Sequence, residues 1–170
     1  MKAKPETDEY ASYYGKYVSL IDDDDIVAAL EWQLAATVAC LRGLSEEQGN
    51  SSYEPGKWNV KELVGHMNDA ERIFGYRALR IARNDKTPLP GFEQDDYIAS
   101  ANFGACSLAD LTTEFELIRR ANLAMFKQFS NEAWVRRGTA SDNTISVRAL
   151  AYIIAGHEAH HMNILRSRYI

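Results

Sequence analysis

The stretch S-V-R-A-L-A-Y-I-I-A-G-H-E-A-H-H-M-N-I-L, residues 146–165, repeats its apolar side chains at steps of three and four residues. That spacing has the period of an α-helix and predicts a helix from Ser146 to about Arg168. One face of this helix carries apolar side chains together with two histidines: Leu150, Ile153, Ile154, His157, His161 and Ile164. We expect this face to turn toward the core, which places His157 and His161 in the interior.

Three further segments show the same period: residues 26–44, 59–83 and 107–126. No segment alternates apolar and polar residues for long, so no strand is predicted. The connection 84–106, between the second and third helices, is long enough for a crossover. Four amphipathic helices with one long connection predict an all-α four-helix bundle.

Two helix starts carry side chains that accept hydrogen bonds from unpaired backbone N–H groups. The aspartates at 22–25 precede the first helix, where carboxylates also complement the helix dipole. Asn59 and Glu62 form an N-x-x-E capping box at the second. A calcium loop is the alternative for the aspartates, but the glycine turn of such a loop is absent.

Composition indicates an ordinary globular protein of one domain, residues 1–170, with residues 1–25 as a tyrosine-rich N-terminal extension packing on the bundle. Charged residues make up 25%, hydrophobic residues 46%, and the net charge is −5, which argues against a nucleic-acid partner. No apolar run reaches the length of a membrane span, and no signal-peptide layout is visible. We therefore expect a cytoplasmic protein without membrane contact.

The four histidines, His66, His157, His160 and His161, suggest a metal site. Two imidazoles four residues apart on one helical face can hold one cation, and H-E-x-x-H at 157–161 matches the pattern of zinc peptidases. Those peptidases take a third ligand from further along the chain, but residues 162–170 contain no His, Asp or Glu. His66 can supply it, because it lies within about 60° of the apolar stripe of its helix.

The alternative is that these histidines are core residues, although each would then need partners for both ring nitrogens. An all-nitrogen ligand set suits Zn, Ni, Cu or Fe. Glu158 and Arg77 are secondary candidates for catalysis, as a base and as an anion-binding group, but each has a structural role as its alternative. His160 lies at the flank of the apolar stripe. It either supports the ligands from behind, lies on the surface, or replaces His161 as a ligand.

The connection 84–106 is also a candidate lid. It carries polar and aromatic side chains after a P-L-P-G turn: Phe92, Asp95, Asp96 and Tyr97. Loops of this length are often functional, and a packed crossover is the alternative.

Three motifs together resemble the DinB superfamily of damage-inducible and thiol-transferase-like proteins. They are Y-E-P-G-K-W-N-V-K-E-L-V-G-H-M-N-D-A-E-R-I-F-G-Y-R-A-L-R-I-A-R at 53–83, T-P-L-P-G-F-E-Q-D-D-Y at 87–97, and the stretch 146–165. The resemblance extends from about Tyr13 to Tyr169, which is nearly the whole chain.

This resemblance implies a four-helix bundle that binds one divalent metal, Zn or Ni, through His66, His157 and His161. It also implies frequent homodimers and a small-molecule substrate, with transfer of a low-molecular-weight thiol such as bacillithiol, mycothiol or glutathione as the leading function. A metal-dependent hydrolase of a small substrate is the alternative. A non-catalytic dimeric stress-response or interaction protein is the third possibility.

Overall fold

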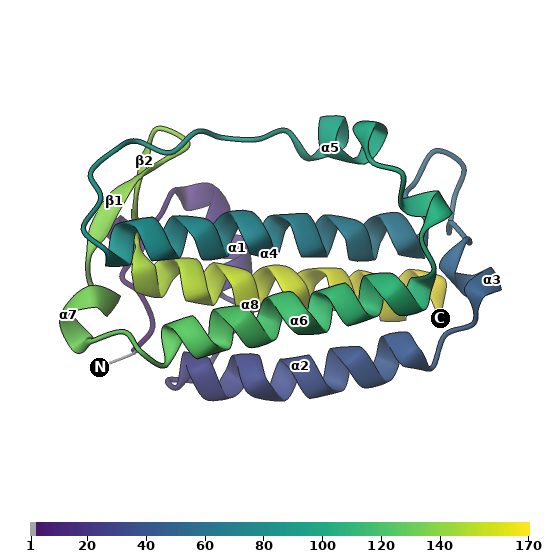
Figure 1. Ribbon diagram of the computed structural model, residues 1–170, viewed down its shortest axis with the longest axis horizontal. Helices are drawn as coiled ribbons and strands as arrows, with labels where there is room; N and C mark the ends of the chain where they lie inside the picture. The colour runs from purple at the N-terminus through teal and green to yellow at the C-terminus, as the bar shows by residue number, and fades with distance from the viewer. Residues whose placement is uncertain (1–2) are drawn as a thin grey trace.

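Four long helices lie side by side in the computed structural model, which describes residues 3–170 (Figure 1). They are α2 (Ile26–Arg42), α4 (Val60–Ala82), α6 (Leu108–Phe126) and α8 (Val147–Ile164). A π-helical turn, Leu165–Tyr169, follows α8 directly. The four-helix bundle predicted from the apolar period is confirmed.

The helix starts form as their side chains predict. Asp25 accepts hydrogen bonds from the backbone N–H groups of Val27 and Ala28, at 3.2 and 3.3 Å. At α4, Asn59 and Glu62 each accept from the other's backbone N–H at 2.8 Å, which completes the capping box. Because unpaired N–H groups at a helix N-terminus are thereby satisfied, both helices begin at defined residues.

Helix α8 is the most deeply buried of the four and contacts α2, α4 and the N-terminal segment. Its buried stretch runs from Ala149 to Glu158 without an exposed residue. Adjacent residues of a helix point about 100° apart, so α8 presents different side chains to different neighbours. This central position decides what His157 and Glu158 can each reach.

The long connection between α4 and α6 crosses the outside of the bundle along α4 and contains the short helix α5 (Gln94–Ser100) (Figure 1). A single 3₁₀ turn, Phe103–Ala105, follows it. Two further short helices belong to the other connections along the chain: α3 (Glu46–Gly49) between α2 and α4, and α7 (Asn131–Trp134) between α6 and α8. No helix within residues 3–170 is long and apolar enough to cross a membrane.

A small antiparallel hairpin precedes α8, and here the prediction that the chain has no strand is wrong. It consists of β1 (Arg137–Ala140) and β2 (Asn143–Ser146), with Gly138 opposite Ile145. The two turn residues, Ser141 and Asp142, have φ values of 50° and 60°. Such turns usually contain glycine or asparagine, so this hairpin with two four-residue strands has little signal in the sequence.

The N-terminal segment packs along α8 through two 3₁₀ turns, Thr7–Glu9 and Ser12–Tyr14, and the short helix α1 (Gly15–Val18). The close approach of α1 to α8 requires glycine at position 156, because a Cβ atom there would lie 2.1 Å from the carbonyl oxygen of Tyr17.

Glu9 is buried beside the start of α8 and anchors the same segment. Its carboxylate accepts from Ser146 Oγ at 2.6 Å and from Arg148 Nε at 2.8 Å. Burial alone would raise the pKa of Glu9, but the hydrogen bonds from Arg148 and Ser146 outweigh it and lower the pKa to about 2. The segment is therefore attached by a charged contact as well as by close packing.

Candidate metal centre

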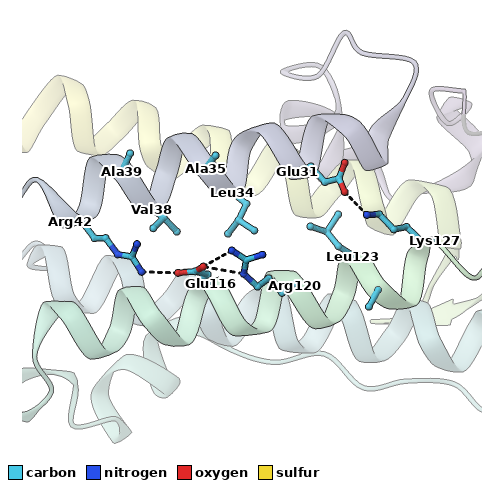
Figure 2. A pocket seen from close by; sticks show the side chains of 11 residues that line it. Glu31, Leu34, Ala35, Val38, Ala39, Arg42, Glu116, Arg120, Leu123 and Lys127 are labelled. Atoms are coloured by element: carbon cyan, nitrogen blue, oxygen red, sulfur yellow. Dashed lines mark hydrogen bonds and ion pairs between the residues drawn. The ribbon is translucent and has the colours of Figure 1, made fainter.

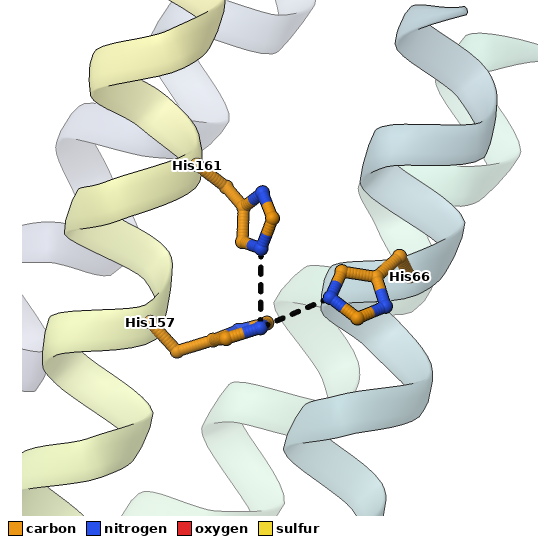
Figure 3. A group of neighbouring side chains, drawn as sticks. All are labelled: His66, His157 and His161. Atoms are coloured by element: carbon orange, nitrogen blue, oxygen red, sulfur yellow. Dashed lines mark hydrogen bonds between the residues drawn. The ribbon is translucent and has the colours of Figure 1, made fainter. Parts of the chain in front are cut away.

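Three histidine side chains converge between α4 and α8 (Figure 3). His157 Nε2 lies 3.0 Å from His66 Nε2 and 3.1 Å from His161 Nε2. All three imidazoles are buried, and one ring nitrogen of each lies within 4.8 Å of the others. The helical spacing of His157 and His161 and the inward position of His66 thus bring together the three residues that the sequence singles out.

Hydrogen bonds among the three imidazoles cannot satisfy all of their ring nitrogens. A neutral imidazole has one N–H donor and one acceptor, so the single Nε2 of His157 cannot pair well with both neighbours at once. His161 Nδ1 is also buried without a hydrogen-bond partner. A cation that accepts the lone pairs of three Nε2 atoms removes the conflict among them, so the donor set fits a divalent transition metal.

The imidazoles are neutral at physiological pH, as metal ligands must be. Burial lowers the pKa of His66 to about 4, against an opposing effect of Asp95. Burial also holds the pKa of His157 and His161 well below the usual value, and the neighbouring imidazoles lower it further. The cluster therefore presents lone pairs to an ion without first having to lose protons.

Aromatic rings surround the cluster and hold the imidazoles in place. Trp58 packs against His66 with the ring centroids 4.9 Å apart, and Tyr17 packs against His157 at 5.3 Å. His160 is half-buried and contacts Tyr17 at 5.4 Å, outside the convergent set. Among the described residues, the group able to hold an ion consists of His66, His157 and His161.

Glu158 points away from the histidines toward α2 and α6. Thr37 Oγ1 donates to Glu158 Oε1 at 2.6 Å, and Arg119 Nη1 lies 2.7 Å from Oε2 as an ion pair outside direct hydrogen-bond geometry. Burial raises the pKa of Glu158, while Arg119 opposes the rise. Its contacts are those of a core carboxylate.

Arg119 completes this ionic core with a second glutamate. Its Nε and Nη2 donate to the two carboxylate oxygens of Glu71 at 2.6 and 2.8 Å. Neither residue was predicted as part of a site, although the sequence contains a signal. Arg119 stands four residues from both Phe115 and Leu123, on the apolar stripe of α6 where a solvated charge is not expected.

Arg77 also has a structural role. Its Nη2 donates to the carbonyl oxygen of Pro90 at 2.6 Å and to Ser141 Oγ at 3.1 Å. Those contacts tie the long connection and the hairpin turn to α4. The structure does not place its guanidinium at the histidines.

A pocket of about 360 Å³ opens onto His161. Its walls include three aromatic and two charged side chains: Tyr53, Trp58, Tyr169, Lys57 and Asp95. Asp95 belongs to α5, so the connection proposed as a lid contributes to this pocket. Tyr53, Lys57 and Tyr169 were missed because they lie on a turn and on the final π-helical turn, where the apolar period gives no guidance.

A larger groove of about 720 Å³ runs between α2 and α6, away from the histidines (Figure 2). Its floor is apolar, and its rim charges are paired: Glu31 with Lys127, and Glu116 with Arg42 and Arg120. Size alone would favour this groove as a binding site. The smaller pocket has the chemistry of a reactive site, because a histidine of the cluster forms part of its wall.

Comparison with known proteins relates the chain to one superfamily. The sequence model of the DinB superfamily matches residues 29–165. A protein of Oceanobacillus iheyensis with the name "Putative metal-dependent hydrolase" is 24% identical over 126 residues, which cover 72% of this chain and 70% of that protein. A protein of the same name from Geobacillus thermodenitrificans is 30% identical over 81 residues, 48% of this chain and 46% of that protein.

Among solved structures, YfiT from Bacillus subtilis has a similar fold. It is described as a probable metal-dependent hydrolase with an unusual four-helix bundle topology. The TM-score is 0.65 at 13% sequence identity, and the match covers 96% of this chain and 91% of YfiT. The shared topology includes nearly all of the bundle and its connections.

Proposed function

The chain belongs to the DinB superfamily, and we propose that it is a metal-dependent hydrolase of a small substrate. The observation that carries the proposal is the convergence of three buried imidazoles on one point beside an open pocket. The names of two relatives and of one protein of similar fold point to the same class of reaction.

His66, His157 and His161 would hold the ion, and Zn or Ni is the expected metal. Three protein ligands leave at least one position for substrate or water, as catalytic zinc sites require. When bound, such an ion acts as a Lewis acid that polarises an oxygen of the substrate and lowers the pKa of water. The burial of the three imidazoles limits competition from solvent.

Two residues of the pocket wall, Trp58 and Asp95, would have distinct roles. Trp58 fixes the ring of His66 and shields it from water, because the two rings pack at 4.9 Å. Asp95 is the carboxylate in the pocket wall, whereas Glu158 is engaged by Thr37 and Arg119 in the core. We therefore assign to Asp95 the acceptance of a proton from the attacking nucleophile.

Thiol transfer, which the family resemblance placed first in the sequence analysis, stays a prediction with a low-molecular-weight thiol as co-substrate. It now ranks second, because the names of similar proteins favour hydrolysis. The non-catalytic alternative needs a closed coordination sphere, and the pocket beside His161 favours an open one.

The homodimer and the cytoplasmic location likewise remain predictions. Sedimentation equilibrium of the purified chain tests the first, and fractionation of cells tests the second. Neither is needed for the proposed reaction, because the histidines and the pocket walls described here come from a single chain.

Metal-reconstituted protein and a panel of chromogenic esters and phosphate esters test the proposal. We expect hydrolysis of at least one ester by the Zn- or Ni-loaded chain, its loss with a chelator, and no hydrolysis by His66→Ala. Conjugation of a small thiol to an electrophile by the loaded chain, without any hydrolysis, would instead support thiol transfer. Full hydrolysis by the chelated protein would contradict a metal-dependent reaction.

A further inference from the structure

The pocket beside His161 has fixed aromatic walls. Tyr169 Oη donates to the carbonyl oxygen of Trp58 at 2.6 Å, and the rings of Tyr53 and Tyr169 pack edge to face at 5.0 Å. Because the hydroxyl of Tyr169 is engaged by the protein itself, its ring offers the pocket mainly apolar surface. Walls of this kind suit a flat apolar group, such as an aromatic ring or a conjugated chain.

Two side chains of opposite charge, Asp95 and Lys57, line the pocket. Asp95 belongs to α5, on the connection that lies along α4, and it lines the pocket together with His161. Lys57 lines the same pocket from the exposed turn that contains Gly56. Among the described residues, Lys57 has no ion-pair partner.

The charge of a ligand follows from this arrangement. A cationic group drawn to Asp95 would be placed next to the divalent ion of the proposed function and repelled by it. An anionic group has an unpaired partner in Lys57, on the exposed turn, so the part of the pocket beside His161 is left to an uncharged group. The two charged side chains thus favour a ligand with an anionic outer end.

We propose that this pocket binds a small organic carboxylate, with its flat apolar body against Trp58 and its carboxylate at Lys57. The reacting end of the molecule would then face His161 and Asp95. This inference rests on the proposed function for the role of the inner end, and it specifies the class of substrate that the site takes.

Binding is measured by titrating the chain with 2-naphthoate, its uncharged analogue 2-naphthamide and the cationic 2-naphthylmethylamine. The probe signals are the three indole N–H resonances, of Trp32, Trp58 and Trp134. Trp32 is exposed and Trp134 is buried elsewhere in the core, so the two are internal controls. Titrations with metal-free and Zn-loaded chain separate binding in the pocket from direct ligation of an ion.

We expect the Trp58 signal to shift with 2-naphthoate in the metal-free chain, with an affinity about threefold to fivefold above that for the amide. In the Zn-loaded chain, where the ion repels a cation, the amine should bind more weakly than the carboxylate. Lys57→Gln should abolish the preference for the carboxylate. Lys86→Gln removes the same charge from a lysine outside the pocket wall and should retain it.

Equal affinity for carboxylate and amide, an unchanged preference in Lys57→Gln, or shifts at Trp32 instead of Trp58 would overturn the inference. These outcomes are independent of metal content and hydrolysis. If the chain fails to bind a metal after reconstitution but still prefers the carboxylate, the proposed function is contradicted and the pocket assignment stands.

Discussion

The carboxylate of Glu158 and the guanidinium of Arg119 meet inside the bundle, with Glu158 Oε2 2.7 Å from Arg119 Nη1. Glu158 follows His157 directly, yet the two side chains serve different neighbourhoods. The side chain of Glu158 therefore joins an ionic core with Arg119 of α6 and Glu71 of α4, whereas the side chain of His157 joins the histidine cluster. The H-E-x-x-H spacing thus supplies two candidate ligands and one core residue.

Replacing Glu158 tests this separation. Glu158→Ala should lower the free energy of unfolding by about 3 to 5 kcal/mol, because it removes one partner from a buried ion pair. Urea denaturation measures the loss, and elemental analysis of the folded fraction should still find metal. Glu132→Ala is the control, since its pair with Arg136 is exposed and its loss should have little effect. Unchanged stability together with lost hydrolysis would identify Glu158 as a catalytic base instead.

Asp95 is expected to act in the pocket without holding the metal. Asp95→Asn should reduce kcat about 100-fold, the scale of a lost proton acceptor, while metal content stays at the wild-type level. Asp96→Asn changes the next residue of α5, which is exposed and outside the pocket wall, and should retain activity. Metal loss in Asp95→Asn, or equal effects of both changes, would refute the assignment.

Replacement of Gly156, even by alanine, is expected to destabilise the protein. Alanine in a helix normally stabilises it by about 1 kcal/mol relative to glycine. Here the added Cβ would lie 2.1 Å from the backbone oxygen of Tyr17, so we expect a net loss of about 1 to 3 kcal/mol. Gly104→Ala, where an added Cβ meets nothing within 4 Å, is the control. Thermal unfolding of both variants measures the difference, and equal melting temperatures would show that the N-terminal segment does not pack here.

The metal-free protein should lose stability in mild acid. Burial lowers the pKa of His66 to about 4, from 6.5 for an unperturbed histidine. Between these values the unfolded chain binds the proton and the folded chain does not, so the free energy of unfolding rises with pH, by up to about 1.4 kcal/mol per pH unit for one histidine. His157 and His161, lowered further, act in the same direction and extend the effect to lower pH.

Urea denaturation of chelator-treated protein from pH 4.5 to 7.5 measures this dependence. The stability should level off above about pH 6.5, where both states are unprotonated at these histidines. His66→Asn should reduce the slope. A flat profile below pH 6.5 would show that the imidazoles are protonated in the folded chain, which would contradict neutral ligands.

The apolar period was enough to predict the long helices and to turn His157 and His161 inward, because both follow from spacing along one helix. It also placed His66 near the core face of its helix. The walls of the pocket could not be predicted in the same way. Tyr169 reaches Trp58 through a π-helical turn, and Lys57 follows Gly56, whose φ is 77°, so their positions depend on irregular backbone.

Charged residues at core positions were a signal that the sequence analysis did not use. Arg119 and Glu71 both interrupt apolar stripes, and in the structure they pair with each other. Arg119 also pairs with Glu158, which directs the Glu158 carboxylate away from the histidines. The hairpin was missed for a different reason, since four-residue strands joined through Ser141 and Asp142 lack both a long alternation and the usual turn residues.

The central claim is that His66, His157 and His161 hold one divalent ion, and metal content per chain tests it most directly. Elemental analysis would compare the reconstituted wild-type chain with His161→Ala and with His160→Ala, a neighbour outside the convergent set. We predict about one Zn or Ni ion per wild-type chain, none in His161→Ala and nearly full occupancy in His160→Ala. Equal losses in the two variants, or no ion in the wild-type chain after reconstitution, would contradict the three-histidine site.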